Sequence, residues 1–171
     1  WLRLVAMSVA GSGLLGTVRS AEPTARSVAY ERLPYTLPAE PKFEVSGIAV
    51  LPDGRAALTL RKGEVWILEN PLEDPTKARF SRFASGLHEP LGLTLHKGAL
   101  YTTQRSEVTR LEDRDGDGVA ETYETVAKGW GLSGNYHEYA YGPVFDPAGN
   151  LWVTLNVTIG NPAKLSGHRG G

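Results

Sequence analysis

The sequence predicts an all-β protein that forms part of a β-propeller. Three segments repeat one pattern: a short apolar strand, a turn that contains glycine, and a second strand rich in β-forming residues. The segments begin at Gly47, Gly92 and Gly142, which are 45 and then 50 residues apart. That spacing is typical of one four-stranded propeller blade. A β-sandwich whose hairpins resemble one another is the alternative.

The composition agrees with a protein built from short strands. With 20 glycines and 11 prolines in 171 residues, the chain is interrupted too often for long helices. Residues 63–69 add a third strand after the first hairpin, and no helical pattern separates the strands, which disfavours a parallel α/β arrangement. A propeller closes with roughly four to eight blades. We therefore expect this chain to hold only two to three blades of a larger domain.

Charge and cysteine content exclude several functions. A net charge of −1 without a cluster of lysines or arginines argues against nucleic-acid binding. The sequence has no cysteine, so disulfides, thiolate metal sites, cysteine nucleophiles and a covalently attached c-type haem are excluded from these residues.

The N-terminal region is predicted to direct export. Residues 1–21 combine an early arginine, an apolar run and a small-residue end, as a signal peptide does. The run is too short and too interrupted for a membrane span, although an uncleaved anchor or a buried helix is an alternative. Residues 22–42, rich in proline, predict a linker or lead-in. Because the chain begins with Trp1 and ends in glycines, we expect residues 43–171 to be a propeller truncated at its C-terminus.

An acidic segment matches the calcium-loop pattern D-x-[DN]-x-[DN]-G-x5-E at every specified position. Alternating acids direct carboxylates to a common centre, and calcium prefers oxygen ligands. The predicted ligands are Asp113, Asp115, Asp117, the carbonyl group of Val119, Glu121 and Glu124. A solvated acidic turn without an ion is the alternative. Because β-forming residues flank the segment, we expect it to join two strands and the ion to be a structural staple.

Three segments together resemble a known family. They are Leu87–Leu93, the loop from Asp113 to Glu124, and Gly131–Tyr139 with the Gly142-Pro143 pair that follows. In this order they resemble the N-terminal propeller of proteins named membrane-bound dehydrogenases in planctomycete and verrucomicrobial bacteria, relatives of the glucose/sorbosone dehydrogenase quinoproteins. The resemblance covers about residues 43–162. It implies an exported six-bladed propeller, followed in many members by helical-repeat and c-type haem domains.

The resemblance also implies a site. In the quinoprotein relatives a histidine shortly before a blade hairpin removes the proton of the substrate hydroxyl, and His137 is the similar position, although its spacing to the hairpin is slightly longer. An imidazole suits that role because it titrates near neutral pH. Alternatively, His137 only hydrogen-bonds the blade backbone. The residues expected to bind cofactor or substrate are His88, Glu89, Asn135, Tyr136 and Tyr139.

The other interpretations of these residues are structural. The aromatic rings could pack between blades, and His88 and Glu89 could lie in a solvated loop. Arg105 could bind an acidic group, but a surface position is expected for it. The predicted function is a dehydrogenase, dependent on pyrroloquinoline quinone (PQQ), that oxidises sugar or polyol hydroxyls outside the cytoplasm, with a structural calcium ion. The alternative is a non-catalytic, calcium-stabilised propeller that serves as a binding or scaffold module. We expect no activity from these residues alone.

Overall fold

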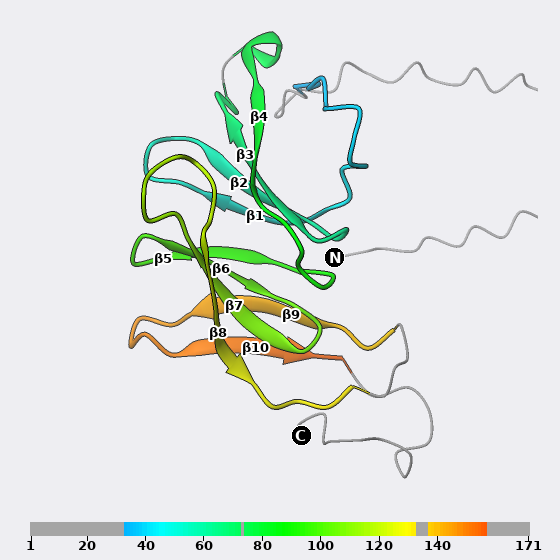
Figure 1. Cartoon of the computed structure of the whole chain (residues 1–171), viewed down its shortest axis with the longest axis vertical. Coiled ribbons are helices and arrows are strands. Elements are labelled where there is room, and N and C mark those ends of the chain that lie inside the picture. The colour runs from blue at the N-terminus through cyan, green and yellow to red at the C-terminus, as the bar shows by residue number, and fades with distance from the viewer. Residues whose placement is uncertain (1–32, 73, 133–136, 157–171) are drawn as a thin grey trace, which may run out of the picture. The chain divides into compact units, whose positions relative to one another are not determined.

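The structure, a computed structural model, describes residues 33–72, 74–132 and 137–156. These residues belong to one compact unit and form three antiparallel sheets and one short 3-10 turn (Figure 1). The all-β class predicted from the sequence is confirmed. Within the described ranges, no helix is long and apolar enough to cross a membrane. The predicted signal peptide lies outside the described residues.

The first sheet is a four-stranded antiparallel meander, with its strands in sequence order. It comprises β1 (Val45–Val50), β2 (Ala56–Leu60), β3 (Glu64–Glu69) and β4 (Arg79–Ala84), with the 3-10 helix η1 (Pro75–Lys77) before β4. The predicted hairpin and third strand are confirmed. The sequence analysis did not identify β4. Its residues at exposed positions are polar, so the segment has no continuous apolar run that would mark it as a strand.

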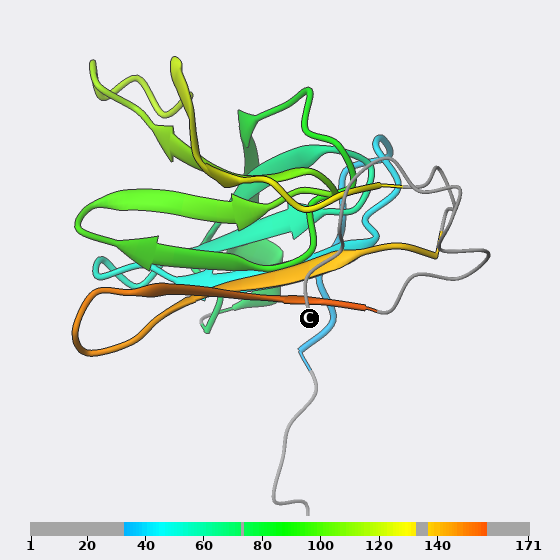
Figure 2. The same ribbon diagram turned by 90° about the horizontal axis from the view of Figure 1, so that it is seen from below.

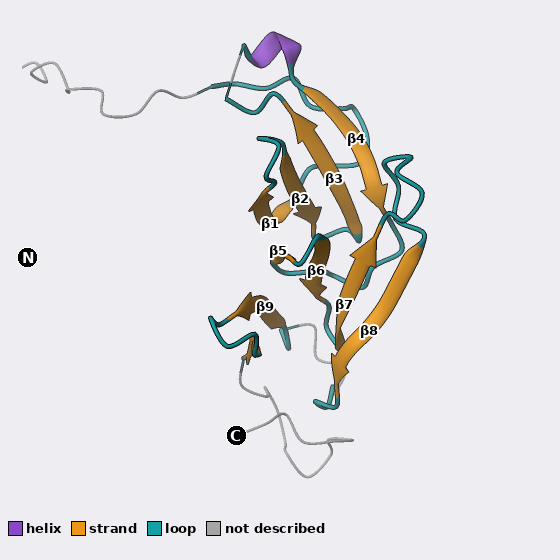
Figure 3. Cartoon of the chain, turned by 90° about the vertical axis from the view of Figure 1, so that its left-hand side faces the viewer, coloured by secondary structure: helices purple, strands orange, loops and turns teal. Residues whose placement is uncertain are grey.

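The second sheet repeats this meander, and a third sheet contains a single hairpin. The second sheet comprises β5 (Leu93–His96), β6 (Ala99–Thr103), β7 (Glu107–Glu112) and β8 (Thr122–Lys128), and the third β9 (Ala140–Phe145) and β10 (Leu151–Leu155). Figure 3 shows how strands and loops dominate, with η1 as the short helical turn. Both remaining predicted hairpins are present, and the acidic segment joins the strands β7 and β8, as expected.

The repeated glycines have a packing reason. Gly47, Gly92 and Gly142 bring the first strands of successive sheets together, backbone against backbone. A Cβ atom on Gly47 would lie 2.6 Å from the Cα of Gly92, and one on Gly92 would overlap the carbonyl oxygen of Gly142. The N–H of Gly142 also donates to the carbonyl of Leu91 at 3.2 Å. Only glycine permits this approach, and Figure 2 shows the β9–β10 hairpin running beside β5 and β6.

The main core lies between the first and second sheets. Strand β2 is buried along its whole length, which places Ala57 toward the second sheet and Leu58 toward the opposite face. Apolar side chains of both sheets fill the space between them, among them Val65, Ile67, Phe83, Leu93, Leu100 and Leu111. Burial of these side chains, at roughly 1.5–3 kcal/mol each, fixes how the two sheets pack.

Residues 33–43 pack on the outer face of the first sheet. The ring of Phe43 lies 5.3 Å from that of Trp66 and 5.4 Å from that of Phe80, and Tyr35 meets Phe80 edge-on. The hydroxyl of Tyr35 donates to the carbonyl of Pro71. Residues 33–42, which the sequence assigns to a linker or lead-in, therefore contribute aromatic packing to the sheet.

Two strand faces leave large apolar side chains exposed. On β1 these are Ile48 and Val50, which are 63% and 75% exposed. On the hairpin, Val144 and Trp152 face each other across the strands and are each 62% exposed. Such faces are typical of surfaces that pack against another element.

The β9–β10 turn gives a testable pH dependence. Asp146 accepts hydrogen bonds from the indole of Trp152, the side chain and backbone of Asn150, and the backbone of Ala148, and these lower its pKa to about 2. A carboxyl group whose pKa is depressed on folding stabilises the protein above its unfolded pKa and loses this effect as pH falls. Asp146→Asn should lower the melting temperature at pH 7, and the difference should shrink between about pH 4 and pH 2. Thermal unfolding followed by circular dichroism checks this, and a difference independent of pH would contradict it.

Candidate functional site

The antiparallel order places successive connections at opposite ends of the strands. The β1–β2, β5–β6, β7–β8 and β9–β10 connections share one end, which includes the acidic loop and is called the acidic-loop end. The β2–β3, β4–β5, β6–β7 and β8–β9 connections share the other, called the His137 end. In Figure 1 the β5–β6 and β9–β10 turns lie at the left, whereas the chain enters β9 from the right. The two predicted sites are therefore separate.

At the acidic-loop end, four carboxylates converge. One oxygen each from Asp113, Asp115, Asp117 and Glu121 lies within 4.8 Å of the others. The loop's own N–H groups orient them: Asp113 accepts from Gly116 at 2.7 Å, and Glu121 accepts from Arg114 at 2.9 Å. Because each carboxylate oxygen has more than one acceptor position, these bonds leave room for a cation. Four like charges this close repel one another unless a cation or protons intervene.

The structure does not bring every predicted ligand to this cluster. Glu124 lies on β8 directly across from Arg110 on β7 and forms a 3.3 Å ion pair with it. Because β8 begins at Thr122, the chain is already extended at Glu124 and no longer curves around the loop. Val119 is exposed, and its N–H donates to the carboxylate of Asp117. The arrangement suits a cluster closed by Glu121, nearer to the aspartates in sequence.

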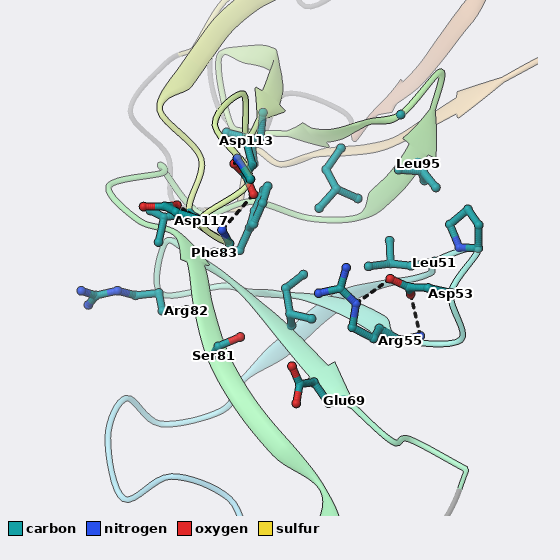
Figure 4. A pocket seen from close by; sticks show the side chains of 18 residues that line it. Leu51, Asp53, Arg55, Glu69, Ser81, Arg82, Phe83, Leu95, Asp113 and Asp117 are labelled. Atoms are coloured by element: carbon teal, nitrogen blue, oxygen red, sulfur yellow. Dashed lines mark hydrogen bonds and ion pairs between the residues drawn. The ribbon is translucent and has the colours of Figure 1, made fainter.

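The acidic loop also contacts the neighbouring sheet. The N–H of Ala120 donates to the carbonyl of Phe83 on β4 at 2.8 Å, and the hydroxyl of Tyr123 accepts from the N–H of Ser85 at 3.1 Å. A cleft of about 630 Å³ lies beside this contact, with apolar residues of both sheets and charged groups along it (Figure 4). The loop is thus part of the seam between the two four-stranded sheets, where the sequence predicted a staple within one.

At the His137 end, a row of charged side chains links the first two sheets. Arg61 binds Glu44 through Nε and Nη2, and its Nη1 lies 2.9 Å from Glu89 Oε1. The other oxygen of Glu89 lies 3.0 Å from Nη1 of Arg105. The hydrogen bonds with Arg61 lower the pKa of Glu44, and those with Glu44 raise the pKa of Arg61. Glu89, predicted as a binding residue, therefore sits between two guanidinium groups.

Arg105 contacts each of the other predicted segments at this end. Its N–H donates to the carbonyl of His88 at 3.2 Å, and its carbonyl accepts from the indole of Trp130 at 2.7 Å. Its guanidinium carbon lies 5.4 Å from the ring centre of Tyr139. The expectation of a surface arginine is wrong: the side chain is 10% exposed. Arg105 thus joins its own connection, β6–β7, to the β4–β5 and β8–β9 connections.

His137 lies in the connection that leads into β9 and is exposed. Asn156, just after β10, holds this connection: its side-chain nitrogen donates to the carbonyl of His137, and its side-chain oxygen accepts from the N–H of Tyr139 at 2.7 Å. The adjacent Glu138 is fully buried. The predicted residues Asn135 and Tyr136 lie outside the described residues.

Sequence reasoning missed Arg61, Glu44, Asn156 and the central place of Arg105. Arg61, Glu89 and Arg105 are separated by 28 and 16 residues and meet only because three connections share one end of the sheets. No local spacing signals such a contact. The burial of Gln104, which precedes Arg105, is likewise visible only in the structure.

Comparison with known proteins supports the fold. No curated protein matches the sequence. A crystal structure of an oxidoreductase from Thermus thermophilus, inferred to be a glucose dehydrogenase, is similar with a TM-score of 0.52 and 24% sequence identity. The match covers 67% of this chain and 37% of that one, so this chain spans well under half of its length. The predicted likeness to glucose dehydrogenases is confirmed at the level of the fold. The model of a domain of unknown function, DUF7133, matches residues 45–167, and the chain belongs to that family.

Proposed function

We propose that this chain forms the first blades of a six-bladed β-propeller in an exported, PQQ-dependent dehydrogenase that oxidises sugar or polyol hydroxyls. The clustering of His88, Glu89, Tyr139 and the His137 connection at one end of successive sheets is the observation that carries the proposal. The glycine contacts between first strands and the likeness to an oxidoreductase inferred to be a glucose dehydrogenase support it. Further blades would cover the exposed apolar faces of β1 and β9–β10, and a c-type haem domain of the same polypeptide would accept electrons.

His137 supplies the proton acceptor in this proposal. His137 is exposed in a connection whose backbone Asn156 holds, so the residue is accessible and its backbone is restrained. A general base positioned on a hydroxyl contributes about 10²–10⁴-fold to the rate. When bound, an oxidised quinone supplies the electron acceptor.

Arg61 and Arg105 do not suit the carboxylates of the quinone, because both are already paired. A quinone with several carboxylates needs cations that are not already neutralised. Arg61 and Arg105 each pair with Glu89, and Arg61 also pairs with Glu44. We therefore assign the cofactor's carboxylates to cations other than these two arginines, and the residues that Arg61 and Arg105 hold to the substrate side of the proposed site.

A structural calcium ion is the second part of the proposal. The four clustered carboxylates are the hard oxygen ligands that calcium prefers, and the loop is already curved around their common centre. Because the loop also contacts β4, an ion there would stabilise the seam between the first two sheets. Asp113, Asp115, Asp117 and Glu121 would hold it.

The function is tested with the full-length protein, PQQ and calcium. We expect the absorbance of the bound quinone to change when a sugar or polyol is added, and a redox dye to be reduced. His137→Gln should lower kcat/KM by about 10²–10⁴-fold. His96→Gln is the matched control and should retain activity, because His96 stacks on Phe145 beside the β5–β6 turn, at the acidic-loop end.

An unreactive wild-type protein would contradict the enzyme proposal. If PQQ caused no spectral change and no sugar or polyol reduced the dye, the calcium-stabilised binding or scaffold module would replace it. Equal loss of activity in both histidine variants would contradict the role given to His137.

A further inference from the structure

Arg105 has contacts that differ in kind from those of an ordinary surface ion pair. Its backbone binds His88 and the indole of Trp130, while its side chain binds Glu89 and lies over the ring of Tyr139. These partners come from the β4–β5 and β8–β9 connections, whereas Arg105 follows β6. A lysine could not reproduce this set, because only the planar guanidinium combines a directed hydrogen bond with stacking on an aromatic face.

Glu89 fixes the direction of the Arg105 side chain. Its backbone has a positive φ of 45°, an uncommon conformation for a non-glycine residue. In that conformation its two oxygens reach Arg61 and Arg105, one each, at 2.9 and 3.0 Å. Arg61 is in turn held by Glu44. Arg105 is thus anchored to the first sheet on one side and reaches the third on the other.

Tyr139 connects Arg105 to the candidate base. The ring of Tyr139 faces the guanidinium of Arg105, and its backbone N–H and carbonyl are both bonded to Asn156. Asn156 also holds the carbonyl of His137, two residues before Tyr139. A continuous chain of contacts therefore runs from Arg105 through the ring and backbone of Tyr139 and through Asn156 to the backbone of His137.

We infer that Arg105 is a positioning residue, which sets the place of His137 relative to the β4–β5 connection through Tyr139. This inference rests on the proposed function for its effect on turnover, and on geometry alone for its effect on the His137 connection. Arg105 does not touch the reacting atoms in this role.

The test compares three variants of the full-length protein. Arg105→Gln and Arg105→Lys should each lower kcat by about 100-fold, the effect of a misplacement of roughly 1 Å at a catalytic group, with KM nearly unchanged. The pH at which kcat changes should stay the same, because the base itself is intact. Arg110→Gln is the matched control: Arg110 also pairs with two glutamates, Glu112 and Glu124, but on the β7–β8 strands. It should lower stability comparably and leave kcat unchanged.

A second measurement does not depend on activity. Hydrogen exchange followed by mass spectrometry should show faster exchange of the peptide that contains the N–H of Tyr139 in both Arg105 variants and not in Arg110→Gln. If wild type shows no turnover but exchange changes as expected, the proposed function fails and the positioning contact stands. If wild type is active and the Arg105 variants keep both its kcat and its exchange rate, the inference is overturned.

Discussion

Gly92→Ala is expected to lower the free energy of unfolding by about 3 kcal/mol. The residue has a φ of +105°, which costs an alanine roughly 1–2 kcal/mol. Its new methyl group would also overlap the carbonyl oxygen of Gly142, and such overpacking costs about 1–3 kcal/mol. The neighbour cannot yield easily, because the obstacle is backbone of the adjacent sheet. Urea unfolding followed by circular dichroism measures the change.

Gly98→Ala distinguishes the conformational cost of a positive φ from the cost of steric overlap with the neighbouring backbone. Gly98 also has a positive φ, +83°, but a Cβ atom there would meet nothing within 4 Å. It should therefore show only the conformational cost of roughly 1–2 kcal/mol. Equal effects of the two substitutions would mean that the first strands do not meet through Gly92, and would contradict the backbone contact between the second and third sheets.

Calcium is expected to raise the stability of the protein by about 2.7 kcal/mol when its free concentration is 100 times its dissociation constant. The physical reason is that the four carboxylates repel one another in the folded loop and an ion removes this repulsion. Removal of calcium with a chelator should reverse the effect. Differential scanning calorimetry at several calcium concentrations checks both statements, and a melting temperature indifferent to calcium would contradict the structural ion.

Glu121→Gln and Glu124→Gln form a matched pair for the same test. The structure places Glu121 in the carboxylate cluster and Glu124 in an ion pair with Arg110. Glu121→Gln should weaken the calcium effect, whereas Glu124→Gln should leave it intact. The opposite result would favour the twelve-residue loop that the sequence pattern predicts, closed by Glu124.

Much of the fold could be predicted because its signals are local. The three hairpins follow from strand–turn–strand patterns, and β3 from the run of apolar, β-forming residues after Gly63. Strand β4 was not predicted, because its exposed polar residues interrupt the apolar pattern. The packing of Phe43 and Tyr35 on the first sheet was not predicted either, because it is a long-range contact without a local sequence pattern. The acidic loop was found for the same reason as the hairpins, since its ligands lie within a few residues of one another.

For the candidate site at the His137 end, the sequence and the tertiary structure each contributed a different part. The sequence by itself supplied the candidates: the acidic residues of the loop by type and spacing, His137 by its resemblance to a position in a known family, and Glu89 by its place in the equivalent turn of the previous repeat. Only the tertiary structure decided that Arg61, Glu89 and Arg105 form one row, that Asn156 holds the His137 connection, and that Glu124 turns away from the carboxylate cluster. The reason is physical. Short-range patterns fix strands and turns, whereas contacts between connections depend on how whole sheets pack, which glycines such as Gly92 set by close backbone approach.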